Sequence, residues 1–361
     1  MGKRIGIVTG GGDCPGLNAV IRAVAKSAWR RGWETIGIVG GYEGLLAPQC
    51  TRPLAYQELD GLLVRGGTIL GTANRGRFSA KVGHGEMRQL PRELLEETRR
   101  GFDSLGLDAL VTVGGDGSLT IAQQFHEFGL PVVGVPKTID NDVGGTVVTF
   151  GFDSAVHCAT EALDRLHSTA ESHQRIMVLE VMGRYAGWIA IYAGIAGGAD
   201  VILIPEIPYR LDSVIGKIRD REQQGKHYTM IVVAEGARPE NGDFVTVAGA
   251  QANRETRLGG IGASLAAQLE QATGKEARSV VLGHLQRGGS PTNMDRTLCT
   301  MFGAKAVELI AEQAFGQMVA FTGTHIVGVP LRDAIGTLRT VPRDGAYVWT
   351  ARSLGICLGD H

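Results

Sequence analysis

Short apolar runs alternate with amphipathic stretches along most of the chain. The runs are rich in valine and isoleucine and are bounded by glycine or proline, which is typical of buried strands. The stretches between them repeat apolar residues at helical spacing. The pattern predicts strands at residues 4–9, 36–39, 109–113, 131–135, 176–181, 201–204, 230–234 and 279–282, and helices at 18–29, 94–105, 119–128, 154–166, 262–272 and 297–310. This alternation indicates an α/β protein with parallel sheets.

The α/β alternation occurs twice, with a restart near Gly151. A chain of 361 residues is also too long for one ordinary core, so two domains are expected. Apolar residues make up 43% of the chain and its net charge is −1, which describes a folded protein. The charge argues against a broad nucleic-acid surface but leaves room for a local basic pocket that holds an anion.

The five cysteines are scattered and form no CxxC pair, which argues against a disulfide framework or a zinc site. The chain begins with a strand, unlike a signal peptide, and no apolar run approaches membrane-spanning length. We therefore expect a cytoplasmic protein whose partners include neither nucleic acid nor a membrane.

Polar residues gather where three predicted strands end. Residues 10–16 (GGGDCPG) and 114–118 (GGDGS) are glycine turns before helices, and residues 136–142 (PKTIDND) follow the strand at 131–135. Glycine turns at helix N-termini suit phosphate, because main-chain N–H groups are exposed and the helix dipole favours anions. GGGDCPG matches neither the P-loop nor the dinucleotide fingerprint, so a simple tight turn is the alternative.

The carboxyl ends of parallel strands share one sheet edge, where ligands bind. If the three loops meet, Asp13, Asp116 and Asp140 share an anion-binding pocket, which calls for a cation. Mg²⁺ suits this pocket because it binds carboxylate and phosphate oxygens with few protein ligands. The carboxylates, lysine and threonine of PKTIDND suit phosphate, metal and a reacting alcohol, but this loop could instead be a turn that hydrogen-bonds itself.

Arginines accompany several other loops. Residues 65–77 carry three arginines among glycines, and residues 283–291 (GHLQRGGSP) carry a histidine and an arginine. Both segments suit phosphate capture. The alternative for residues 65–77 is a loop of solvated arginines, and the alternative for residues 283–291 is a capped loop. Residues 182–187 (MGRYAG) again end a strand with glycine and a cation, whereas the polar insertion at 237–260 indicates no chemistry.

Together these motifs resemble the bacterial-type 6-phosphofructokinases over nearly the whole chain. The matching blocks are GGGDCPGLNAVIR, GGDGS, PKTIDND, SHQRI, MGRYAGW, the EGA at Glu235 and GHLQRGGSPTNMDR, in family order. GGDG alone also resembles NAD kinases and lipid kinases, but the other blocks have no place in those families.

The resemblance implies two Rossmann-like three-layer α/β domains with the active site in the cleft between them. Residues 1–150 plus about 290–338 would form the nucleotide (phosphoryl donor) domain. Residues from about 151 to 289, with the tail 339–361, would form the fructose 6-phosphate domain.

The resemblance also implies phosphoryl transfer from ATP to the 1-hydroxyl of D-fructose 6-phosphate, the committed step of glycolysis. Asp140 would accept the hydroxyl proton, with Thr138 and Arg184 beside the transferring group. Asp142 would support the carboxylate and metal environment, and Asp116 would hold Mg²⁺. The positions that match the nucleotide site are Gly12, Arg75, Gly115, Asp116, Gly117 and Ser118, and those that match the sugar phosphate site are Thr138, Ile139, Asp140, Arg175, Met182, Gly183, Arg184, Glu235, Arg278, His284 and Arg287.

In the family, the arginines at the positions of Arg175 and Arg278 reach in from a neighbouring subunit. The resemblance therefore implies at least a dimer, with a homotetramer as the usual assembly. A catalytically silent sugar-phosphate-binding regulatory subunit is the remote alternative, and the presence of Asp140, Asp116 and Arg184 argues against it.

Two positions bear on the phosphoryl donor, and they point in different directions. Relatives that use pyrophosphate usually have aspartate where this chain has Gly117, and lysine where it has Lys137. A carboxylate at position 117 would repel the ATP α-phosphate, so Gly117 permits ATP. Mixed-type relatives with this glycine and lysine include ATP users. ATP is therefore the prediction, and a pyrophosphate-dependent fructose 6-phosphate 1-phosphotransferase is the runner-up.

Short bacterial relatives bind effectors between subunits through a set of basic residues. Arg22 matches that set and Lys26 is a conservative change, whereas His167 stands where arginine is expected and Asp200 where glutamate is. Activation by ADP or inhibition by phosphoenolpyruvate is therefore not assumed.

Overall fold

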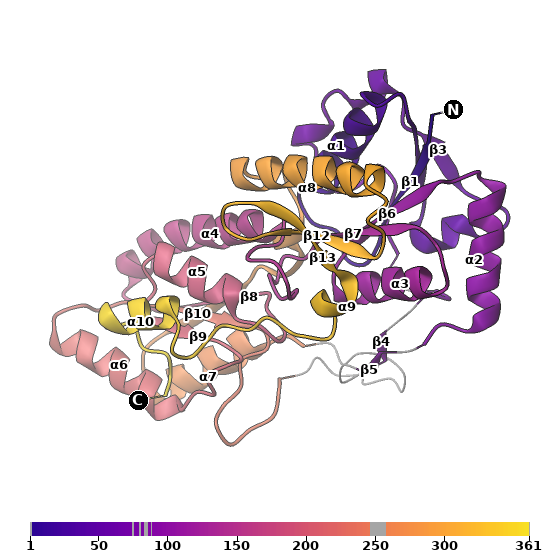
Figure 1. Ribbon diagram of the computed structural model, residues 1–361. Helices are drawn as coiled ribbons and strands as arrows, with labels where there is room; N and C mark the ends of the chain where they lie inside the picture. The colour runs from indigo at the N-terminus through magenta and orange to yellow at the C-terminus, as the bar shows by residue number, and fades with distance from the viewer. Residues whose placement is uncertain are drawn as a thin grey trace. The chain divides into compact units, whose positions relative to one another are not determined.

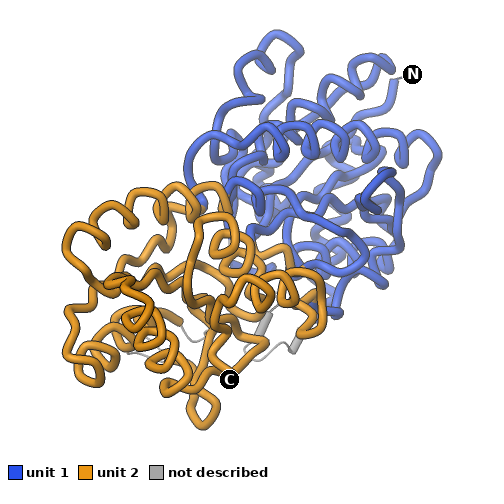
Figure 2. The backbone as a smooth tube through the Cα atoms, turned by 90° about the vertical axis from the view of Figure 1, so that its left-hand side faces the viewer, with its two compact units in different colours: residues 1–139, 143–154, 287–338 blue, residues 140–142, 155–286, 339–361 orange. Residues whose placement is uncertain are grey.

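The computed structural model describes residues 2–73, 76–78, 81–82, 86–87, 89–245 and 258–360. The chain divides into two compact units, which Figure 2 shows in blue and orange. Unit 1 comprises residues 1–139, 143–154 and 287–338, and unit 2 comprises residues 140–142, 155–286 and 339–361. Each unit has its own mainly parallel sheet, so the predicted α/β class is confirmed.

Unit 1 is built on a seven-stranded sheet. Its order is β13 (Ile326–Pro330), β12 (Gln317–Phe321), β7 (Val132–Pro136), β6 (Ala109–Gly114), β1 (Arg4–Thr9), β2 (Glu34–Ile38) and β3 (Thr51–Pro53). The five inner strands are parallel, and β13 and β3 run antiparallel at the two edges. The chain proceeds from β1 to one side and from β6 to the other, so the strand order reverses between them. Ligands bind at such a switch point in open α/β sheets.

Helices cover both faces of the unit 1 sheet (Figure 1). They are α1 (Leu17–Trp29), α2 (Arg92–Ser104), α3 (Asp116–Glu127), α8 (Asn293–Ala311) and the short α9 (Leu331–Ala334), with 3₁₀ turns at Gly41–Leu45, Tyr56–Leu59 and Leu62–Val64 and a small hairpin of β4 (Lys81–Val82) and β5 (Glu86–Met87). α1 and α8 pack side by side and approach closely at Gly303, where a Cβ atom would lie 2.6 Å from Cβ of Ala23. On the other face α2 and α3 bury Leu94, Phe102 and Phe125.

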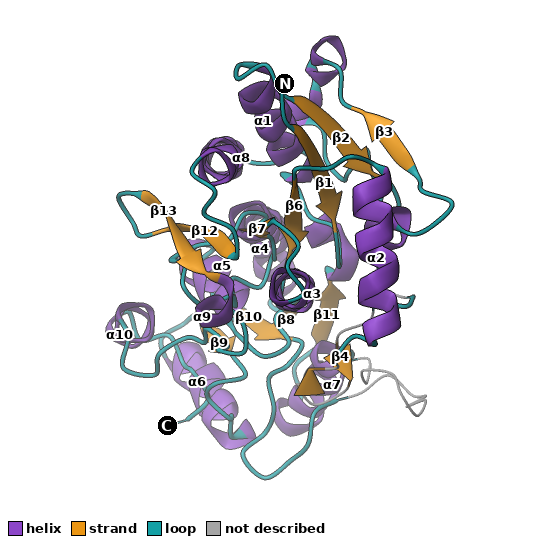
Figure 3. Cartoon of the chain, turned by 45° about the vertical axis from the view of Figure 1, so that its right-hand side comes forward, coloured by secondary structure: helices purple, strands orange, loops and turns teal. Residues whose placement is uncertain are grey.

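Unit 2 is built on a four-stranded parallel sheet. Its order is β11 (Ala277–Val281), β8 (Ile176–Val181), β10 (Thr229–Ala234) and β9 (Val201–Leu203). Its helices are α4 (Phe152–His173), which begins in unit 1, α5 (Trp188–Ala196), α6 (Leu211–Gln223), α7 (Ile261–Thr273) and α10 (Ala346–Ser353), with a 3₁₀ turn, η4, at Gly283–Arg287. α6 and α7 contribute Val214, Ile218 and Leu265 to the core on this sheet. Figure 3 shows both helices beside the strands of this unit.

The predicted strands and helices are all present, but three helices differ from the prediction by three residues or more at one end. α8 begins at Asn293, four residues before the predicted start at Thr297, because the Thr292 side chain accepts the N–H of Asp295 and caps the helix there. α4 continues to His173, seven residues beyond the predicted end at Leu166, because Ala170 extends its buried face by one more turn. The sequence pattern does not predict β3, β4, β5, α6, β12, β13, α9 or α10. In the described part of the chain, no helix combines the length and apolar character needed to cross a membrane.

Candidate functional site

The glycine turn after β1 is fixed at the carboxyl edge of the unit 1 sheet. Gly10 donates its N–H to the carbonyl of Val113 at the end of β6 (2.9 Å). Gly16, the residue before α1, has a φ of 111°. A Cβ atom there would lie 2.7 Å from Sγ of Cys299 and 2.8 Å from the ring of Phe150. The fold therefore requires glycine at the point where this turn enters α1.

The first turn of α3 lies beside this glycine turn. A Cβ atom at Gly10 would lie 2.7 Å from Oγ of Ser118, and the Tyr42 hydroxyl donates to the carbonyl of Ser118 (2.9 Å). The prediction of a helix starting only at residue 119 is wrong, because Asp116, Gly117 and Ser118 already form the first turn of α3. An acidic residue suits a first helical turn, whose N–H groups have no partner within the helix. This helix N-terminus can bind an anion.

Asp116 is the predicted metal ligand, and it lies at the start of α3. Its Oδ1 accepts a hydrogen bond from the N–H of Gly336 (3.3 Å). Within the described ranges, no group of three or more His, Cys, Asp or Glu side chains could hold a metal. Mg²⁺ is commonly bound through one or two carboxylates together with substrate phosphates and water. A single carboxylate beside an anion-binding helix end fits that donor set.

Lys137 follows β7 and its side chain points to the glycine turn. Its N–H donates to the carbonyl of Gly114 (2.9 Å), and its Nζ donates to the carbonyl of Gly12. The residue is only 3% exposed. A Cβ atom at Gly115 would lie 3.2 Å from the Lys137 carbonyl oxygen. The ends of β1, β6 and β7 therefore meet.

Arg287 also reaches the glycine turn. Its Nη1 donates to the carbonyl of Asp13 (3.1 Å), and a Cβ atom at Gly12 would lie 2.6 Å from the same nitrogen. The sequence predicts that Arg287 and His284 together capture phosphate. His284 is exposed on η4 in unit 2, whereas Arg287 lies against the glycine turn of unit 1.

The chain passes from unit 1 to unit 2 inside the PKTIDND motif, after Ile139. The carbonyl of Thr138 accepts a hydrogen bond from the hydroxyl of Thr149 (2.7 Å), and Ile139 is 1% exposed. Asn141 has a φ of 53°, in the left-handed region that asparagine tolerates better than most residues. Asp140 and Asp142 therefore lie on either side of a residue with a left-handed backbone conformation, and all three belong to unit 2.

In unit 2 the ends of the neighbouring strands β8 and β10 bring two predicted substrate loops together. Gly236 donates its N–H to the carbonyl of Gly183 (3.1 Å), and a Cβ atom at Gly236 would lie 2.0 Å from the carbonyl oxygen of Arg184. Glu235 donates its N–H to the carbonyl of Val181 (2.8 Å). The loops that carry Arg184 and Glu235 are thus in main-chain contact.

Gln286 is a structural residue of this site that the sequence did not reveal. It is 1% exposed, and its Oε1 accepts the N–H of Met182 (2.8 Å). Its Nε2 donates to the carbonyl of Ala155 (3.5 Å). A glutamine inside HLQR gives no local signal of burial, but here it fixes the start of the MGRYAG loop.

Arg175 and Arg278, the two predicted contributors to a neighbouring site, meet on one carboxylate in this structure. Nε of Arg175 lies 2.5 Å from Oε2 of Glu276, and Nη2 of Arg278 pairs with Oε1 of the same side chain. Hydrogen bonding from Arg175 lowers the pKa of Glu276. Both guanidinium groups are thus held at one place on the surface of unit 2.

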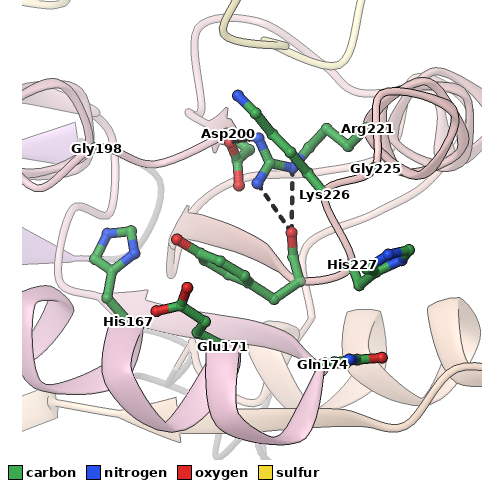
Figure 4. A pocket seen from close by; sticks show the side chains of 10 residues that line it. His167, Glu171, Gln174, Gly198, Asp200, Arg221, Gly225, Lys226 and His227 are labelled. Atoms are coloured by element: carbon green, nitrogen blue, oxygen red, sulfur yellow. Dashed lines mark hydrogen bonds and ion pairs between the residues drawn. The ribbon is translucent and has the colours of Figure 1, made fainter.

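A cavity of about 520 Å³ lies in unit 2 beside α4 (Figure 4). His167 and Asp200, two of the positions that depart from the effector-binding set, both line it. Asp200 pairs with Arg221, which donates from Nη2 to the carbonyl of Tyr228 (2.9 Å), and the imidazole of His167 lies 2.7 Å from the carbonyl of Gly197. Burial raises the pKa of Asp200.

Two predicted features lie wholly or partly outside the described residues. Arg75 is one, and residues 246–257 of the polar insertion are the other.

Comparison with known proteins gives consistent matches. A family model described as phosphofructokinase matches residues 4–310. A Chloroflexus aurantiacus relative, named ATP-dependent 6-phosphofructokinase, is 54% identical over 364 residues, covering 99% of this chain and 98% of the relative. An Amycolatopsis methanolica relative, named pyrophosphate–fructose 6-phosphate 1-phosphotransferase, is 49% identical over 341 residues, covering 94% and 96%.

The crystal structure of a Pichia pastoris phosphofructokinase in the T-state superposes with a TM-score of 0.81 at 33% identity. The match covers 92% of this chain and 35% of that chain, so this chain spans about a third of its length.

Proposed function

The chain belongs to the phosphofructokinase family, and on that premise we propose that it transfers a phosphoryl group from ATP to the 1-hydroxyl of D-fructose 6-phosphate. The products are fructose 1,6-bisphosphate and ADP, and the reaction is the committed step of glycolysis. The observation that carries the proposal is the contact between the glycine turn, the start of α3 and Lys137. Together they offer main-chain N–H groups and an amine to a polyphosphate.

For the nucleotide side we propose Gly12, Arg75, Gly115 and residues 116–118 as the lining. Gly12 and residues 115–118 belong to the two segments that meet at the switch point of the unit 1 sheet. Asp116 would hold Mg²⁺, which when bound neutralises charge on the donor phosphates.

For the chemistry we propose that Asp140 accepts the proton of the sugar hydroxyl. Thr138 and Arg184 would stabilise the transferring group, and Asp142 would support the carboxylate. Phosphoryl transfer depends mainly on positioning and on neutralising charge, so a base, a hydroxyl and a guanidinium suffice without a covalent intermediate.

For the sugar phosphate we propose a site assembled from strand-end loops. The contact between the Arg184 and Glu235 loops supports it. Arg175 and Arg278 would complete the site of a neighbouring subunit, in a dimer or tetramer. The remaining proposed contacts are Ile139, Met182, Gly183, His284 and Arg287.

Pyrophosphate is the second candidate donor, because relatives that use it usually have lysine where this chain has Lys137 and one such relative is 49% identical to this chain. The buried amine at the glycine turn can bind phosphate from either donor. Gly117 favours ATP, because no side-chain carboxylate at this position opposes a phosphate at the start of α3.

A steady-state assay with ATP and with pyrophosphate in parallel, each with and without Mg²⁺, tests the proposal. We expect Mg²⁺-dependent formation of fructose 1,6-bisphosphate with a higher kcat/KM for ATP. A preference for pyrophosphate would refute the donor assignment, and binding of the sugar phosphate without turnover by either donor would refute the proposed reaction.

A further inference from the structure

The turn that carries Asp140 receives two hydrogen bonds from a residue close to the C-terminus. The N–H of Arg339 donates to the carbonyl of Asp142 (2.9 Å), and its Nη1 donates to the carbonyl of Asn141 (3.0 Å). Asn141 is 1% exposed and left-handed, a conformation that persists only when its surroundings hold it. Arg339 therefore fixes two consecutive carbonyls immediately after the proposed base.

Arg339 is itself held in place by Trp188, the first residue of α5. The guanidinium carbon lies 4.2 Å from the centre of a Trp188 ring, and Nε1 of Trp188 donates to the Arg339 carbonyl (3.0 Å). Trp188 is 3% exposed and follows the MGRYAG loop directly. A planar guanidinium can stack on the indole and still donate in its own plane, which an ammonium cannot do.

Two residues further along, the same segment is tied to the MGRYAG loop through Glu206. Oε1 of Glu206 accepts the N–H of Val341 (2.8 Å) and that of Gly187 (3.0 Å). A Cβ atom at Gly187 would lie 2.9 Å from Oε2 of Glu206, so glycine permits this close approach. Residues 339–341, here called the C-terminal strap, thus contact the turn after Asp140 directly and the MGRYAG loop through Glu206.

We propose that Arg339 is a positioning residue for phosphoryl transfer, holding the Asp140 turn in one frame with the loop that carries Arg184. The proposal rests on the proposed function, in which Asp140 and Arg184 act on the same phosphoryl group. All the contacts described lie inside unit 2, so the frame is a property of one folded unit. In-line transfer is sensitive to displacements of about 1 Å, which can cost about 100-fold in rate.

The test compares Arg339→Gln, Arg339→Lys and Arg339→Ala with Arg352→Ala. Arg352 is a matched control, since it belongs to the same tail but lies on α10 and makes an ion pair with Asp360 (Nη2 to Oδ2, 2.6 Å). We expect Arg339→Gln to lower kcat roughly 10- to 100-fold while KM for both substrates changes less than about threefold. Arg339→Lys should fall between the wild type and Arg339→Gln, and Arg352→Ala should match the wild type.

Chemical rescue separates positioning from folding. Millimolar guanidinium should restore part of the kcat of Arg339→Ala, and methylammonium at equal concentration should restore less, because only guanidinium reproduces the stacked planar donor. Thermal unfolding of each variant reports on the fold independently.

A wild-type kcat in Arg339→Gln would overturn the inference. The inference would also fail if Arg339→Ala and Arg352→Ala each lost kcat in proportion to their drop in Tm and guanidinium restored no activity. If the wild-type protein shows no turnover with either donor, the proposed function fails and the inference fails with it. If the wild type is active and Arg339→Gln keeps its kcat, only the inference fails.

Discussion

Nζ of Lys137 donates a hydrogen bond to the main-chain carbonyl of Gly12, 125 residues earlier in the chain. The amine is therefore built into the wall of the glycine turn, and its residue is almost fully buried. A phosphate that approaches this turn meets the same ammonium whichever donor carries it. Selection between the donors should then depend on position 117, at the start of α3.

Replacing Gly117 with aspartate should therefore lower kcat/KM for ATP at least about tenfold and affect pyrophosphate less. The new carboxylate would stand where the helix N-terminus otherwise favours a phosphate, and its charge would oppose that phosphate. Steady-state kinetics with both donors measure the effect. Gly117→Asn, which has nearly the same size without the charge, is the control. An equal loss in the two variants would show that bulk, not charge, excludes ATP.

Asp140→Ser should lower kcat by about 100- to 10,000-fold with an unchanged fold, because the proposed general base is removed. Single-turnover measurements with either donor report the rate of phosphoryl transfer, and circular dichroism reports the fold. Asp103→Ser, an exposed position on α2, should behave like the wild type. Activity retained in Asp140→Ser would remove this residue from the mechanism.

Mixing subunits tests whether Arg175 and Arg278 complete a neighbour's site. Asp140→Ser and the double variant Arg175→Ala, Arg278→Ala should each be nearly inactive alone. After dissociation and reassembly as an equal mixture, a paired assembly should regain roughly a quarter of the wild-type activity, since half the pairs are hybrids with one intact site. No recovery, with mixed assemblies shown by native mass spectrometry, would contradict the shared site.

Asp295 should make the stability of the protein fall as the pH rises from about 4 to about 6. It is fully buried in α8, where its carboxylate accepts the N–H groups of Gly151 and Ser154 at 2.9 Å. Burial raises its pKa from 3.8 to about 6, so the folded state favours the protonated form. The stabilisation is fully present below about pH 4 and is lost as the pH rises through the folded pKa, by at most about 3 kcal/mol.

Urea unfolding of the wild type and of Asp295→Asn across this pH range measures that contribution. The difference in unfolding free energy between the two should decrease as the pH rises from 4 to 7. Asp103→Asn provides the comparison for a surface carboxylate. A difference that stays constant with pH would show that Asp295 keeps its ordinary pKa in the folded protein.

The local pattern sufficed to predict the main strands and helices, since each has a clear apolar period and glycine boundaries. It failed at the start of α3, because glycine at position 117 resembles a loop while the helix actually begins at Asp116. It also missed β3, the β4–β5 hairpin and α6, and in the C-terminal region β12, β13, α9 and α10, although glycines flank β12 and α10.

The candidate site followed from the sequence only where a motif is contiguous. The glycine turn and PKTIDND are such motifs. Gln286 and Arg339 instead act through contacts with Met182 and Asn141, at separations of 104 and 198 residues. An arginine in a polar tail has no local feature that marks such a contact, because the partner is chosen by the tertiary fold. The resemblance places residues 339–361 in the second domain but assigns no role to Arg339.

The last residues of the chain also protect the sheet of unit 2 from unwanted pairing. The main-chain N–H of Cys357 donates to the carbonyl of Asp200 (3.0 Å), and its carbonyl accepts the N–H of Ile202 (2.9 Å). Cys357 therefore pairs with the outer side of the edge strand β9. Exposed strand edges are templates for association with other chains. Proteolytic loss of the final residues should therefore promote aggregation, even where the catalytic loops are untouched.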